Sequence, residues 1–191
     1  MADLPSDAFE QLPLRSAPEV ARRCLILYAV VAAGHKSPRE ELVRWLLREA
    51  LWESVSTEES AFLRSSSPSR QQMIGATWRA EALLTLLWAL ARIQALPPPT
   101  GQCDVPLIRS ALAPLLGSTS EFISKASIRN EAEIIDVHED TYQAHWAVRD
   151  AVINDRPVPD RYNLEILQER HHALNWLIFP EQGWDDVTTD T

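Results

Sequence analysis

Apolar side chains recur along this chain at the three- and four-residue spacing of amphipathic α-helices, and capping residues precede several of these stretches. Ser16-x-x-Glu19, Ser37-Pro-Arg-Glu40 and Ser56-x-x-Glu59 each have the spacing of a capping box, in which serine and glutamate satisfy free backbone N–H groups. They predict one helix that stops at Gly34, a second that carries Leu42, Leu46 and Ala50 on one stripe, and a third that ends near Arg64.

One stretch in the middle of the chain is apolar on every side. From Ala82 to Ala91 only Thr85 is polar, and a helix that is apolar all round is buried all round. We expect Ser67 to cap this helix and the run Pro97-Pro98-Pro99 to follow its end. The pattern predicts that residues 78–95 form the centre of the fold.

The pattern of the remaining residues also predicts helices. We expect a helix that Asp104 caps and that reaches Gly117, a short one within 118–127, a long one over 129–153 and a last one over 163–179. Period-two alternation is absent, which argues against a sheet. The prediction is a single all-α domain over residues 1–191, with about seven helices. Residues 1–15 form an extended arm, and the tail at 180–191 folds back because Trp184 favours burial.

Charge is distributed unevenly along the chain. The 18 basic and 27 acidic side chains give a net charge of −9, and residues 131–191 alone carry 4 basic and 14 acidic side chains. Such a surface repels phosphate backbones, so we expect no nucleic-acid partner and favour a basic protein. No apolar run approaches the length of a membrane span, so we expect no membrane partner. Cys24 and Cys103 lack metal-ligand spacing and are interpreted as reduced thiols in the cytoplasm.

Polar residues at helical spacing make up the candidate site. His138, Tyr142, His145 and Arg149 form one stripe of the long helix beside an apolar stripe. In the last helix, His171 shares the helical spacing of the apolar residues, so we expect it to point towards the core. In the central helix, we expect Glu81 to pair with an arginine. The candidate cluster comprises Arg79, Glu81, Tyr142, His145, Arg149, Glu169, Arg170, His172, Asn175, Asp186 and Asp190. We also expect Asp185, Asp186 or Asp190 to pair with Arg79, Arg149 or Arg170.

Several chemistries could use this cluster. Glu169-x-x-His172 has the spacing of ligands in di-metal carboxylate bundles, but such sites need a second copy that this chain lacks. A single metal ion between His138 or His145 and Glu169, His172 or Asp190 is an alternative, as is acid–base catalysis by His145 or His172. A structural network that docks the last helices is the interpretation we favour, and we expect no metal and no cofactor.

Four segments together resemble a known family. They are Trp78-Arg79-x-Glu81-Ala82-Leu83, Asp140-x-Tyr142-x-x-His145-Trp146-Ala147-x-Arg149-Asp150, Glu169-Arg170-His171-x-Ala173-Leu174-Asn175-Trp176-Leu177 and Trp184-Asp185-Asp186-Val187-x-Thr189-Asp190-Thr191. The family is an uncharacterised bacterial one, domain of unknown function 4272, and the resemblance extends over most of residues 14–191. At Gln143 the family often has a basic residue. The resemblance implies a helical, cytoplasmic bacterial protein and supplies no activity.

Two functional hypotheses remain. The first is a non-enzymatic binding protein whose acidic C-terminal third holds a basic protein, in the manner of a toxin-neutralising immunity protein. The second is a small-ligand binder or hydrolase-like enzyme, with or without a metal, whose pocket is lined by histidine, glutamate and arginine. Convergence of Glu81, His145 and His172 on an open cavity would favour the second.

Overall fold

The computed structural model describes residues 14–190, and within this range all regular secondary structure is helical, with no β-strand. The predicted all-α fold is therefore confirmed. Eight α-helices are described, together with the 3-10 turns η1 (Trp52–Ser54) and η2 (Trp184–Asp186). The helices are α1 (Ala17–Gly34), α2 (Arg39–Arg48), α3 (Thr57–Arg64), α4 (Arg70–Ala89), α5 (Val105–Ala111), α6 (Ser120–Ser124), α7 (Glu131–Ile153) and α8 (Leu164–Ile178).

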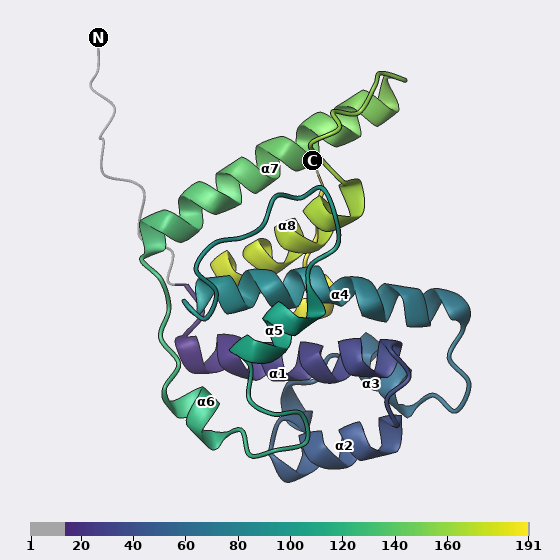
Figure 1. Cartoon of the computed structure of the whole chain (residues 1–191), viewed down its shortest axis with the longest axis vertical. Coiled ribbons are helices and arrows are strands. Elements are labelled where there is room, and N and C mark those ends of the chain that lie inside the picture. The colour runs from purple at the N-terminus through teal and green to yellow at the C-terminus, as the bar shows by residue number, and fades with distance from the viewer. Residues whose placement is uncertain (1–13, 191) are drawn as a thin grey trace.

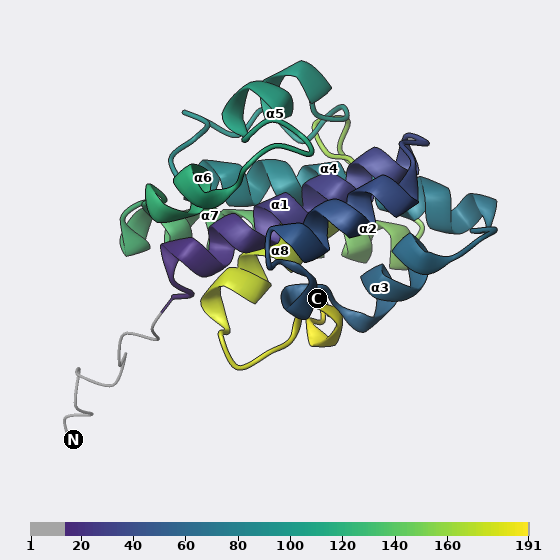
Figure 2. The same cartoon turned by 90° about the horizontal axis from the view of Figure 1, so that it is seen from below.

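Four long helices form a stack at the centre of the molecule. Helix α4 packs against α1 on one side and α8 on the other, and α7 packs against the far side of α8 (Figure 1). The shorter helices α2 and α3 contact α1 and each other, and the tail after α8 returns towards α3 (Figure 2). Helix α7 therefore forms one end of the stack.

The core is built by two helices rather than one. Every residue of α4 from Ala80 to Ala89 is buried, as the apolar run predicts. Helix α1 is buried to the same degree, since only Arg22 is exposed between Val20 and Ala33. The two helices approach closely at Gly34, where an added Cβ would lie 3.0 Å from Ala76 Cβ.

Some predicted helix ends are correct and others are not. Glu19 Oε2 accepts the Ser16 backbone N–H at 3.0 Å, and Ser56 and Glu59 form the predicted capping box. The other two predicted caps are wrong, since Pro38 is the N-cap of α2 and Ser69 that of α4. Helix α5 also stops at Ala111, well before the predicted Gly117.

Most of the predicted N-terminal arm lies outside the described residues, which begin at Leu14. Arg15 is described and lies against the end of α8, where its Nε donates to the Trp176 carbonyl at 2.7 Å. Across residues 14–190, no helix combines the length and the apolar character needed to cross a membrane.

Candidate functional site

Glu81 and Arg170 form a buried ion pair between α4 and α8. Arg170 Nη2 lies 3.1 Å from Glu81 Oε2, and the two side chains are 5% and 1% exposed. The other carboxylate oxygen accepts the Cys103 backbone N–H at 2.6 Å, while Arg170 Nη1 donates to the Pro97 carbonyl at 2.7 Å. The prediction that Glu81 pairs with an arginine is confirmed. Because all these groups are hydrogen-bonded, this junction attaches the loop after α4, which contains Pro97 and Cys103, to the core.

A group of three histidines fastens α7 to α8. His145 and His171 are buried, and their Nδ1 atoms lie 3.0 Å apart, so one donates and the other accepts. His138 Nε2 lies 2.7 Å from the Asn175 side-chain oxygen, which can only accept a hydrogen bond. The Tyr142 ring meets His171 edge-on, with 5.6 Å between the ring centres. These contacts define the histidine group: His138, Tyr142, His145, His171 and Asn175.

The surroundings of His145 and His171 favour neutral imidazoles. Burial lowers the pKa of His171 to about 4, and the neighbouring His145 and His138 act in the same direction. Burial also lowers the pKa of His145, to which the positive charge of Arg149 contributes. Both shifts favour uncharged rings at neutral pH, and the mutual hydrogen bond requires that the accepting ring be neutral.

Trp184 holds the tail against α8 and α1. This indole is 4% exposed and lies against the His172 ring, with 4.5 Å between ring centres. His172 Nε2 donates to the Trp184 carbonyl oxygen at 3.1 Å, and the Arg23 guanidinium lies 4.9 Å from the centre of the indole ring. Further along, Asn175 donates to the Thr188 carbonyl at 2.9 Å.

Arg79 connects α4 to α8 beside this tail. Its Nη1 lies 3.2 Å from both carboxylate oxygens of Glu169. Burial raises the pKa of Glu169, although the Arg79 guanidinium opposes this effect. Burial, followed by the charge of Arg79, lowers the pKa of His172 to about 4.

The predicted partners of the tail aspartates are wrong. Arg79 pairs with Glu169, Arg170 pairs with Glu81, and Arg149 donates to the Thr189 carbonyl at 3.4 Å. In residues 14–190 no ion pair joins these arginines to the tail. Asp186 and Asp190 are exposed, and Asp185 Oδ2 accepts the backbone N–H of Glu58 at 2.9 Å. Carboxylates on α8 and α4 pair with Arg79 and Arg170, and Arg149 contacts a backbone carbonyl of the tail instead of an aspartate.

Glu169 and His172 have the spacing of metal ligands, but their side chains point to different partners. Glu169 faces Arg79, and His172 faces the Trp184 carbonyl. Within the described part of the chain, no three histidine, cysteine or acidic side chains are grouped so that they could hold a metal ion.

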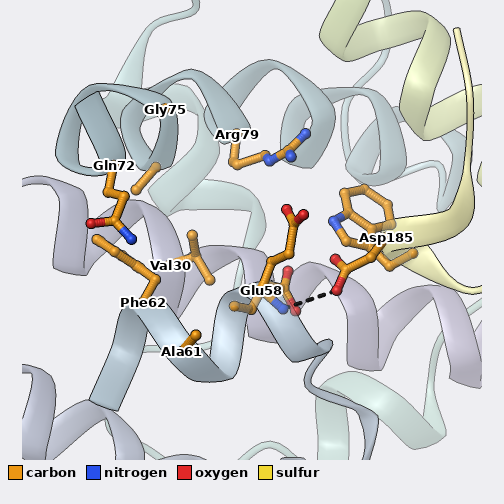
Figure 3. A pocket seen from close by; sticks show the side chains of 11 residues that line it. Val30, Glu58, Ala61, Phe62, Gln72, Gly75, Arg79 and Asp185 are labelled. Carbon is orange, nitrogen blue, oxygen red and sulfur yellow. Dashed lines mark hydrogen bonds between the residues drawn. The ribbon is translucent and has the colours of Figure 1, made fainter. Parts of the chain in front are cut away.

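A pocket of about 390 Å³ opens between α3, α4 and the tail. Figure 3 shows Arg79 on the α4 side and Glu58 and Phe62 on the α3 side, with Asp185 at the tail. Of the predicted cluster, only Arg79 lines this pocket. The full lining is Val30, Glu58, Glu59, Ala61, Phe62, Gln72, Gly75, Ala76, Arg79, Trp184 and Asp185.

The family of the chain follows from a match over nearly its whole length. A family model described as "Domain of unknown function (DUF4272)" matches residues 3–187. The chain belongs to this family. No curated protein and no solved structure matches it. The resemblance seen in the four sequence segments is thus confirmed, and the site must be interpreted from its own geometry.

Helix α7 of this DUF4272 protein also presents an exposed acidic face. It carries six acidic side chains against the single Arg149, and Trp146 and Ile135 are 47% and 40% exposed. We call the exposed residues on these turns the α7 outer face: Ile135, Asp136, Glu139, Asp140, Gln143 and Trp146.

The structure therefore divides the predicted cluster among separate places. Glu81 and Arg170 form one junction, and Tyr142, His145 and Asn175 belong to the histidine group. Arg79 and His172 lie against Trp184, and Glu169 pairs with Arg79. The pocket residues Glu58, Phe62 and Gln72 were not predicted, because nothing in the sequence shows that α3 faces α4. The helical spacing that places Trp146 on one face with Glu139 was the available signal for the α7 outer face.

Proposed function

We propose that this protein is a non-enzymatic binding protein and that the α7 outer face holds a basic protein partner. The observation that carries the proposal is the half-exposed Trp146 on a helix with six acidic side chains and one arginine. Tryptophan contributes strongly to interface affinity because it buries a large area, and complementary charge speeds association.

The partners of the acidic side chains support this proposal. Glu133 pairs with Arg129, and Asp150 pairs with Arg156. Asp136 and Asp140 are exposed, and neither carboxylate has a hydrogen-bond or ion-pair partner among residues 14–190. These two carboxylates are available to lysine or arginine side chains of a partner.

The opposite side of α7 gives the face a firm support. Thr141, Ala144, His145 and Val148 are buried, and the histidine group fixes α7 on α8. A face held in place before binding loses less conformational entropy when a partner docks. The hydrogen bond between buried His145 and His171 also fits a docking role better than catalysis.

We place this activity in the bacterial cytoplasm. Cys24 and Cys103 are both free thiols, and burial raises the pKa of each, that of Cys103 to about 12. Unpaired, protonated thiols fit a reducing compartment. Neutralisation of a basic toxin by an immunity protein is the kind of interaction that this surface would serve.

A matched pair of charge reversals tests the proposal. Asp136→Lys/Asp140→Lys changes the α7 outer face, and Glu53→Lys/Glu181→Lys makes the same change in net charge at exposed positions elsewhere. Tagged wild-type protein and both variants are used to capture proteins from a lysate of the source organism at low and moderate salt. The captured protein is then purified and its affinity is measured by calorimetry.

We expect a basic protein that binds the wild type and the control variant, and that binds Asp136→Lys/Asp140→Lys at least about ten-fold more weakly. Raising the salt concentration should weaken binding, because exposed charges are screened. Capture of no partner at either salt concentration, or equal affinity for both variants, would contradict the proposal.

A further inference from the structure

The pocket between α3, α4 and the tail is lined by both acceptors and donors. Glu58 and Asp185 supply carboxylates from α3 and the tail, and Arg79 supplies a guanidinium from α4 (Figure 3). We propose that this pocket binds a small zwitterion of the amino-acid class, with its ammonium group on the carboxylates and its carboxylate on the donors. This site is separate from the α7 outer face.

The carboxylates of the pocket have capacity for an ammonium group. Glu59 is already paired, because both of its oxygens lie 2.7 Å from Arg23 Nη1. The Glu58 carboxylate is exposed and has no hydrogen-bond partner among the described residues. Asp185 uses Oδ2 for the Glu58 backbone N–H, which leaves its second oxygen for a ligand. Two carboxylates at the pocket are therefore not neutralised by a basic side chain.

The donors of the pocket have unused N–H groups. Arg79 reaches Glu169 through Nη1 alone, and its Nε and Nη2 meet no acceptor within residues 14–190. Trp184 is 4% exposed, and its Nε1 is buried without any acceptor in that same range. A buried donor without a partner is costly, and this cost is recovered when a bound group supplies the acceptor. A ligand carboxylate against Arg79 and Trp184 would do so.

The remaining lining residues suit a small ligand with an apolar part. Val30, Phe62 and Ala76 are buried and contribute apolar side chains. The volume of about 390 Å³ lies near the lower end of the range of about 300–1,000 Å³ that small-ligand sites occupy. Because Trp184 and Asp185 belong to the tail, an occupied pocket would also tie the tail to α3 and α4.

The first experiment uses the full chain and three sets of probes. The twenty L-amino acids are compared with the corresponding amines that lack the carboxylate and the corresponding acids that lack the amine. The readouts are the melting temperature and, for any probe that raises it, calorimetric affinity. We expect at least one amino acid to bind, and both truncated analogues to bind at least about ten-fold more weakly, because each loses charge-assisted hydrogen bonds.

Two variants with matched controls locate the site. Glu58→Gln should weaken binding about ten-fold, and Glu53→Gln, the same change outside the pocket, should not. Gly75 lines the pocket, and a Cβ there meets nothing within 4 Å, so Gly75→Leu should occupy the pocket without harming the fold, while Gly75→Ala should retain binding.

Melting curves of the free variants confirm that each is folded before binding is measured. The proposal is overturned if no amino acid binds, if an amine or an acid alone binds as tightly as the amino acid, or if Glu58→Gln and Gly75→Leu both bind like the wild type.

Discussion

At the residue scale, three consecutive polar side chains of α8 each take a partner from a different part of the chain. Arg170 reaches α4, His171 reaches α7, and His172 reaches the tail. Each partner satisfies a group that would otherwise be buried at a cost in free energy. A single helix therefore connects α4, α7 and the tail through hydrogen bonds.

The histidine group makes stability depend on pH. The pKa of His171 is about 4 in the folded chain and near 6.5 in the unfolded chain, and the pKa of His145 is lowered as well. Below pH 6.5 the unfolded state therefore binds more protons than the folded state. This contribution to stability is complete above pH 6.5 and is lost as the pH falls towards about 4.

We predict that the free energy of unfolding, measured by urea titration, falls from pH 6.5 to pH 4, and that this fall is smaller in His171→Gln. The exposed His35→Gln should keep the wild-type fall. An identical pH dependence in all three proteins would show that the histidine group does not titrate on unfolding.

At the element scale, two glycines in the same layer of helices have opposite packing. Gly34 ends α1 where α4 is closest, and an added Cβ would lie 3.0 Å from Ala76 Cβ and from Thr77 Cγ2. Gly75 lies within α4, and an added Cβ would meet nothing within 4 Å. Neither glycine has a positive φ, so the space around the added Cβ and the position in the helix distinguish them.

Alanine at these two positions should have opposite effects. Gly34→Ala should lower the free energy of unfolding by about 1–3 kcal/mol, because α1 and α4 must move apart. Gly75→Ala should raise it by about 0.5–1 kcal/mol, because glycine weakens a helix interior. Urea titration of both variants measures these changes, and destabilisation by Gly75→Ala would contradict the described packing.

Local signals predicted the helices better than their ends. The buried run in α4 and the box at Ser56 could be predicted because apolar periodicity and capping depend on neighbouring residues. Ser37 and Ser67 have similar local chemistry, yet Pro38 and Ser69 occupy the cap positions. The end of α5 at Ala111 has no local signal as strong as a capping box.

At the scale of the whole molecule, the tail contributes to both the core and the pocket. Trp184 packs on His172 and Trp176, while Asp185 binds the start of α3. The inward position of His171 could be predicted from helical spacing. The partners of Arg79 and Arg170 could not, because several carboxylates were available and only the three-dimensional arrangement selects Glu169 and Glu81.

Removal of the tail should therefore destabilise the entire fold. Loss of a buried tryptophan costs about 3–5 kcal/mol, which corresponds to a fall in melting temperature of roughly 6–20 °C in a chain of this size. Deleting residues 184–191 and recording the melting curve by circular dichroism tests this. An unchanged melting temperature would mean that the tail does not contribute to stability.

The central claim is that a basic protein binds the α7 outer face, and carboxyl labelling tests it most directly. Carbodiimide labelling of the free protein and of the complex with its captured partner is compared residue by residue. We predict that labelling of Asp136, Glu139 and Asp140 falls in the complex, while labelling of the exposed Glu53 and Glu181 stays the same. Unchanged labelling of Asp136, Glu139 and Asp140, with protection elsewhere, would contradict the account.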